Sequence, residues 1–172
     1  MVLARITKST IESVAYNNIF ETINTRSYVA DPRDPGGTDN REFVYDSDPF
    51  HKAINFSDFP YIILNLPETV EPSQESVNSD TQRKSWKQTI IVRTVKDGSS
   101  GTRANQGRTD LLNIGDDLHE TFENSTVEYD LGSTGIFHLK LVKVGFDTDV
   151  IDQQTVYESE YELTYSMRLI VD

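Results

Sequence analysis

Two segments of the chain repeat hydrophobic residues with the spacing of an amphipathic helix. The first begins at residues 9–12, where Ser-Thr-Ile-Glu forms a capping box that satisfies free amides at a helix start. The second covers residues 108–123. Gly115 lies beside its apolar stripe, so we expect the helix backbone to approach a sheet closely there. The apolar positions recur at steps of three and four residues: Ile11, Val14, Ala15, Ile19 and Ile23, then Leu111, Ile114, Leu118 and Phe122.

Four further segments have the patterns of β-strands. Residues 60–67 form an apolar run between two prolines, typical of a short buried strand, and residues 86–95 predict a central strand because their centre is β-branched. Residues 157–171 alternate apolar and polar side chains, which predicts a long antiparallel strand with one wet face. Within 137–146 the apolar positions change from odd to even numbers. This slip predicts a bulge over residues 140–143.

The predicted order of elements is helix, strand, strand, helix, strand, strand. This order is typical of the α+β class, with a mainly antiparallel β-sheet and two α-helices packed on one face. A chain of 172 residues is long enough for one sizeable core, so we expect a single domain over residues 1–172.

Residues 31–59 interrupt this pattern. Aspartate, proline and glycine punctuate the segment, which predicts a long loop containing at most a short strand near residues 43–45. Its aromatic content is too high for a free tether, because aromatic side chains anchor interfaces. We therefore expect its second half to dock on its own subunit or on a neighbouring one. The candidate interface residues are Phe43, Tyr45, Phe50, Phe56 and Phe59.

Composition narrows the possible functions. The chain has 28 acidic and 16 basic side chains, a net charge of −12, which is the wrong sign for gripping nucleic-acid phosphates. Such acidity is also found in proteins of high-salt environments. The sequence has no cysteine, which excludes disulfides and thiolate zinc sites and favours an intracellular location. No apolar run approaches the roughly 20 residues of a membrane span, so no membrane association is expected.

Candidate chemistry is sparse. His51, His119 and His138 have no second ligand at metal spacing. Asp147, Asp149 and Asp152 lack the glycine and terminal glutamate of a calcium loop, and we interpret them as part of a hairpin turn. The glycine-containing segment 96–108 matches no phosphate-binding spacing, and no nucleophile elbow is present. We predict no catalytic residue, no metal ligand and no cofactor, and thus a protein that is not an enzyme.

Several of these segments together carry a resemblance to a known family. The chain resembles the tail terminator (tail completion) proteins of long-tailed viruses of bacteria and archaea. The resemblance covers most of the chain outside residues 31–59. It rests on the N-terminal amphipathic helix and on four stretches: Phe-Pro-Tyr-Ile-Ile-Leu at 59–64, Thr-Ile-Ile-Val-Arg-Thr-Val at 89–95, Arg-Thr-Asp-Leu-Leu-Asn-Ile-Gly-Asp-Asp-Leu-His at 108–119, and Glu-Tyr-Glu-Leu-Thr-Tyr-Ser-Met-Arg-Leu-Ile-Val at 160–171.

The resemblance implies a structural protein of the virion, assembled in the host cytoplasm. Such proteins form a hexameric ring on the head-proximal end of the tail tube, stop its growth and join it to the head connector. The implied partners are further copies of the chain, the tail tube protein and a head connector or head-completion protein, with DNA passing through unbound. The alternatives are another head-tail neck or tail tube protein, or a non-enzymatic acidic α+β binding domain.

Three glutamates are the best candidates for the lumen of such a ring. Glu158, Glu160 and Glu162 are spaced by two on the wet face of the last predicted strand. They would face passing DNA, or pair with a basic patch at Arg103 or Arg108 of a neighbouring subunit. An ordinary solvated strand face explains the same spacing.

Overall fold

The computed structural model describes residues 11–25, 27–34, 36–38, 41–47, 49, 58–70, 75–78, 81–96, 106–151 and 153–170. The elements found in these ranges are α1 (Ile11–Asn24), β1 (Val44–Tyr45), β2 (Tyr61–Leu64), β3 (Glu68–Thr69), β4 (Glu75–Asn78), β5 (Thr81–Val95), α2 (Gln106–Glu123), α3 (Ser125–Ser133), β6 (Ile136–Ile151) and β7 (Gln154–Ile170).

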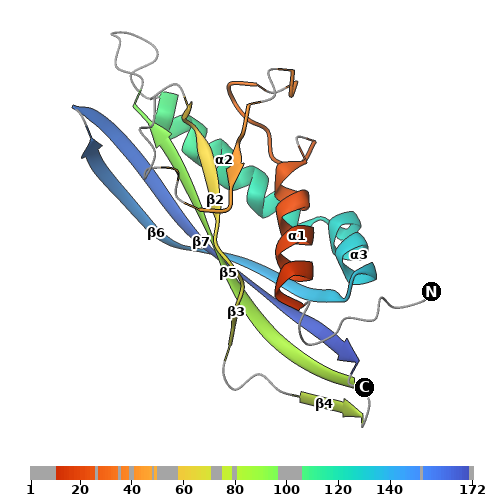
Figure 1. Ribbon diagram of the computed structural model, residues 1–172. Coiled ribbons are helices and arrows are strands. Elements are labelled where there is room, and N and C mark those ends of the chain that lie inside the picture. The colour runs from red at the N-terminus through yellow and green to blue at the C-terminus, as the bar shows by residue number, and fades with distance from the viewer. Residues whose placement is uncertain are drawn as a thin grey trace.

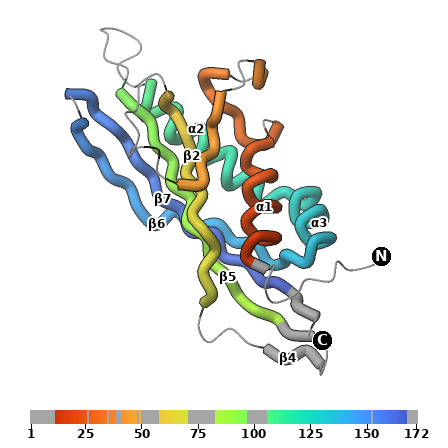
Figure 2. Tube along the Cα trace, viewed as in Figure 1, coloured from red at the N-terminus to blue at the C-terminus, as the bar shows by residue number. Residues whose placement is uncertain are grey.

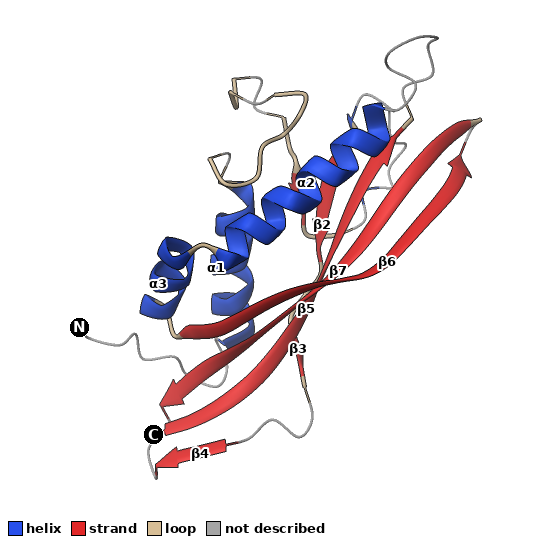
Figure 3. Ribbon diagram, turned by 180° about the vertical axis from the view of Figure 1, so that it is seen from behind, coloured by secondary structure: helices blue, strands red, loops and turns tan. Residues whose placement is uncertain are grey.

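All strands of the described chain belong to one sheet of order β1-β2-β5-β7-β6, and β3 and β4 also pair with β5. Only the two-residue β1 is parallel to its neighbour, so the sheet is mainly antiparallel. The helices α1, α2 and α3 all lie on one face of the sheet (Figures 1 and 3). The predicted α+β class with helices on one face is thereby confirmed.

The number of helices differs from the prediction, because the described residues contain three rather than two. The additional helix, α3, starts after Asn124, whose side chain accepts a hydrogen bond from the Thr126 backbone N at 2.8 Å. This cap separates α3 from α2, which ends at Glu123. Only Val127 and Leu131 of α3 are buried, and two apolar positions are too few to reveal a helical period.

The main core lies between the helices and the sheet. On β2, Ile62 and Leu64 face the helices, while the intervening Tyr61 and Ile63 belong to a second cluster on the other face. The apolar stripes predicted for both long helices enter the main core, with the exception of Ile11, whose side chain lies outside the described part, and Val14, which packs at its border. The core residues that the helices supply are Ala15, Ile19, Ile23, Leu111, Ile114, Leu118, Phe122, Val127 and Leu131.

Two glycines allow α2 to lie directly on the strands. A Cβ atom at Gly115 would overlap the hydroxyl of Tyr161 on β7, and one at Gly107 would overlap the carbonyl oxygen of Val95 at the end of β5. The Gly107 carbonyl in turn accepts a hydrogen bond of 2.6 Å from the Thr94 hydroxyl. The predicted close approach at Gly115 is confirmed, and Gly107 provides a second one eight residues earlier.

The strands β6 and β7 form a long hairpin that continues beyond the helix layer (Figure 1). The register of β6 shifts twice, between Phe137 and Lys140 and between Lys143 and Gly145. These irregularities border the range 140–143 in which the sequence predicts a bulge. Before the second shift Lys143 lies on the helix-covered face, opposite Tyr161. After the shift Phe146 lies on that face, opposite Ser159, so the residues that share a face change from odd to even numbers.

The start of β5 and the segment before it differ from the sequence prediction. The central strand β5 begins at Thr81 rather than at residue 86, and the polar segment before it contains β3 and β4 instead of only loop. Residues 81–85 are polar, so they carry no apolar strand pattern. Their extended conformation follows from pairing with β7 as far as Ile170.

Candidate interaction surfaces

The face of β7 that points away from the helices carries the three predicted glutamates. Tyr161, Leu163 and Tyr165 point into the main core, so the alternate residues Glu158, Glu160 and Glu162 project from the opposite face. We call this side of the sheet the open face, because all described helices lie on the other side (Figure 3). The polar face predicted for the last strand is therefore the open face of the sheet.

Two of the three glutamates have cationic partners within the same subunit. The Glu158 Oε2 atom lies 2.5 Å from Nε of Arg93, the residue directly opposite on β5. The Glu162 Oε2 atom lies 4.0 Å from Nζ of Lys87, which also approaches Glu68 at 3.6 Å. Glu160 is exposed and makes no ion pair with any other residue of the described ranges.

Two aspartates of β6 extend the acidic surface of the open face. Asp147 lies opposite Glu158 in the β6–β7 register, and Asp149 lies opposite Val156. Residues directly opposite each other in adjacent strands share a face, so both aspartates project on the same side as Glu160. Both are exposed. The exposed acidic residues that β6 and β7 place on the open face are thus Glu160, Asp147 and Asp149.

Part of the open face is apolar. Five buried residues form a second cluster there, and its centre is the ring of Tyr61, which lies 4.9 Å from the Phe59 ring and 5.5 Å from the Tyr45 ring. Burial, followed by the charges of Glu42 and Asp58, raises the pKa of the Tyr45 hydroxyl. The cluster consists of Phe59, Tyr61, Ile63, Val95 and Val156.

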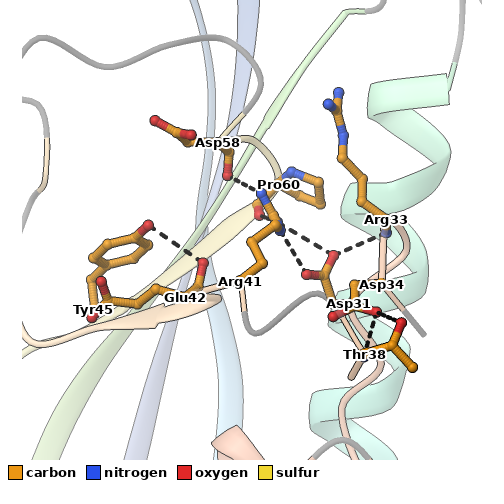
Figure 4. Close-up of polar contacts among 9 residues, drawn as sticks. All are labelled: Asp31, Arg33, Asp34, Thr38, Arg41, Glu42, Tyr45, Asp58 and Pro60. Atoms are coloured by element: carbon orange, nitrogen blue, oxygen red, sulfur yellow. Dashed lines mark hydrogen bonds and ion pairs between the residues drawn. The ribbon is translucent and has the colours of Figure 1, made fainter. Parts of the chain in front are cut away.

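The segment 31–59 is held to the sheet by a buried ion pair (Figure 4). Asp31 is fully buried, and its Oδ2 atom lies 2.8 Å from Nε of Arg41. The same guanidinium donates to the backbone carbonyls of Asp58 and Pro60, at the entry to β2. We call Asp31, Arg41 and these two carbonyls the loop clasp. It joins both ends of the segment, so the described part of this loop is docked on its own subunit.

The predicted interface aromatics lie in different settings. Phe43 and Phe59 are 1% and 0% exposed, and both pack inside the subunit, because the clasp and the β1–β2 pairing bring them onto the sheet. Their rings are therefore already covered and offer little surface to a neighbour. Tyr45 is half-buried. Phe50 and Phe56 lie outside the described residues, as does Arg103. Arg108 is exposed in the first turn of α2.

Large apolar side chains are exposed at three places that the sequence analysis did not select. Leu66 follows β2, Leu112 and Tyr129 lie on α2 and α3, and four residues lie along β6, the last strand in the sheet order. Alternation along β6 is broken by the bulges, which is why its exposed apolar residues could not be assigned to a face from sequence. The four residues of β6 are Val142, Val144, Phe146 and Val150.

No group of three or more metal-binding side chains occurs among the described residues. None of the described helices is long and apolar enough to cross a membrane. Comparison of the chain with protein-family models and with curated proteins gave no match.

Proposed function

We propose that this chain is a structural subunit of a ring that caps the head-proximal end of a viral tail tube, ends tube growth and joins the tail to the head connector. The observation that carries the proposal is the division of the sheet into two unlike faces. One face is covered by helices, and the open face bears exposed acidic residues over β6 and β7. A ring of such subunits has a helical outside and an acidic inside.

The acidic residues support passage of DNA rather than binding of DNA. Like charges repel across a channel, so a lumen lined by Glu160, Asp147 and Asp149 keeps phosphates from adhering to its wall. Glu158 and Glu162 contribute less to this field, because Arg93 and Lys87 offset their charges. The lumen surface in this proposal therefore consists of Glu160 on β7 and of Asp147 and Asp149 on β6, rather than of the three glutamates alone.

Ring closure requires two different surfaces on each subunit. The exposed Leu112 and Tyr129 on the helix layer and the exposed Leu66 beyond β2 belong to separate regions of the subunit. Large side chains of this kind anchor protein interfaces when they enter pockets of a partner. They are the candidate contacts between neighbours, and Arg108 on the exposed side of α2 adds a charge near Leu112.

The proposal is tested by electron microscopy of the protein alone and with tail tubes, combined with mass measurement by light scattering. We expect rings with the mass of about six subunits, bound at one end of each tube, and tubes that no longer lengthen in their presence. Binding along the whole tube indicates a tube protein instead. A monomer that ignores tube ends and gains thermal stability with a small molecule indicates the acidic binding domain.

A further inference from the structure

The outer edge of β6 is a long strand edge that is unpaired within the described part of the chain. β6 is the last strand in the sheet order, sixteen residues long, and no described strand pairs with its outer side (Figure 2). A free edge presents unpaired backbone N–H and C=O groups and is a template for another strand. The side chains of Val142, Val144, Phe146 and Val150 are 42–66% exposed along this edge.

The register of the sheet shows which backbone groups of β6 point outward. The Lys96 N atom donates to the Thr155 carbonyl, so odd-numbered residues of β7 bond to β5 and even-numbered ones bond to β6. The partners of even-numbered β7 residues include Val142 and Asp147, which therefore point inward. The outward-pointing residues are 139, 141 and 143 before the bulge, and 146, 148 and 150 after it.

This phase change makes the edge complementary to itself. When a second β6 is placed antiparallel, with the two-fold axis between Val144 and Gly145, residue 143 of one copy lies opposite residue 146 of the other. Residue 141 then lies opposite 148, and 139 opposite 150, so every outward-pointing residue meets another outward-pointing one. We propose that two copies of this chain associate by pairing their β6 edges in this register.

Three side-chain pairs of this register are complementary, whereas Val142 lies opposite Asp147 and Leu141 opposite Thr148. On the open face Lys140 lies opposite Asp149 of the second copy, and the two-fold axis repeats this opposite-charge pair. On the helix-covered face Leu139 lies opposite Val150, and Lys143 lies opposite Phe146. Lys143 already places its Nζ 5.5 Å from the centre of its own Phe146 ring, so the same cation–π contact is available across the interface.

The local hydrogen bonds of the edge fit the same pairing. The Oδ1 atoms of Asp147 and Asp149 accept hydrogen bonds of 2.7 Å from the N atoms of Thr148 and Val150. These two N–H groups are among the outward-pointing donors, so the carboxylates occupy the positions where carbonyls of a second strand would lie. On pairing, backbone carbonyls of the second copy would replace the carboxylates as acceptors for the Thr148 and Val150 N–H groups. The Asp149 side chain would then be able to face Lys140 of the second copy.

This association goes beyond the proposed ring. Pairing of β6 with β6 is a two-fold contact in which both copies use the same surface, whereas a cyclic ring uses two different surfaces on each subunit. The dimer therefore does not require the ring, and the ring does not require the dimer.

The test exchanges the charges of the Lys140–Asp149 pair. For each variant the dimer dissociation constant is measured by sedimentation velocity at 0.15 M salt. Lys140→Asp and Asp149→Lys each create two like-charge pairs and should raise the dissociation constant roughly tenfold. An equimolar mixture of the two variants, and the double variant in one chain, should each recover the affinity of the unchanged protein. Glu128→Lys on the exposed side of α3 is the control with the same charge change as Asp149→Lys and should have no effect.

The recovery in the mixture is decisive, because only a contact of β6 with β6 restores opposite charges in that way. A protein that is monomeric at the highest concentration, single variants that associate like the unchanged protein, or a mixture that does not recover would each overturn the inference. Circular dichroism and urea midpoints verify that every variant is folded. Rings of six whose mass is unaffected by these variants support the ring and overturn β6 pairing, and β6 dimers that ignore tube ends do the reverse.

Discussion

Ion pairs occur on both sides of the sheet, and their surroundings differ greatly. On the helix side Asp31 is fully buried and holds Arg41, whose side chain is 18% exposed. On the open face the side chains of Lys87 and Glu162 are about 40% exposed and lie 4.0 Å apart. The Glu158–Arg93 pair is intermediate, at 30% and 16% exposed. The buried ion pair therefore fixes a loop, whereas the exposed ion pair lies on the surface and holds no segment in place.

The physical reason for the difference is the water that surrounds each pair. Removing one partner of a buried pair leaves an uncompensated charge in the interior, which costs about 3–5 kcal/mol of stability, whereas an exposed pair contributes about 0–1 kcal/mol. In the loop clasp the Arg41 guanidinium also donates to three acceptors: the Asp31 carboxylate and the backbone carbonyls of Asp58 and Pro60. Loss of a charged partner should thus be costly at the loop clasp on the helix side, whereas the exposed charge pairs of the open face should tolerate it.

The largest expected effect is at the clasp. Arg41→Met leaves Asp31 buried without its guanidinium and frees the carbonyls of Asp58 and Pro60, so the free energy of unfolding should fall by about 3 kcal/mol in urea titrations. The matched control is Arg33→Met in the same loop, where the exposed side chain is expected to change stability by less than about 0.5 kcal/mol. Equal effects of the two variants would mean that the clasp does not hold the segment 31–59.

A smaller but distinct effect is expected at the contact of α2 with β5. Gly107→Ala places a methyl group against the Val95 carbonyl oxygen, a backbone atom that cannot rotate away, and should reduce the free energy of unfolding by about 2 kcal/mol. Asn113→Ala on the exposed side of the same helix is the control. It gains helix propensity and should raise stability by a few tenths of a kcal/mol. A stabilised Gly107→Ala variant would contradict the close packing of α2.

The faces of the elements were predictable from sequence, and their partners were not. Alternation in β7 identified which residues face the core, and the three-and-four spacing identified the buried stripes of α1 and α2. Periodicity does not specify which strand lies alongside, so Arg93 could not be assigned to Glu158 although the two residues are directly opposite. Once the β5–β7 register is known, the remaining pairings of these strands follow from it.

The loop and the edge strand were predicted, but the contacts of the loop and the faces of the edge-strand residues were not, for different reasons. Asp31 and Arg41 are ten residues apart in a segment without periodicity, so no local pattern linked them. In β6, two register shifts break the alternation on which a face assignment depends. The interface hypothesis for Phe43 and Phe59 relied on composition, and burial of both rings within the subunit shows that an aromatic-rich loop is equally suited to docking on its own sheet.

The smallest expected effects are on the open face, where they separate the glutamate with a strong partner from the one without. Glu158→Gln removes a hydrogen-bonded ion pair with Arg93 and should lower the free energy of unfolding by about 1 kcal/mol. Glu160→Gln removes only a repulsive charge beside Asp147 and Glu158, so stability should stay within about 0.5 kcal/mol of the unchanged protein or rise slightly. Both variants replace glutamate by glutamine at successive positions of one strand face, so each serves as the control for the other.

Raising the salt concentration to 1 M should shrink the stability difference between the two variants, because screening weakens exposed charges more than half-buried ones. If Glu160→Gln is the more destabilising variant, the open face holds a partner for Glu160, and its charge is no longer free to line a channel.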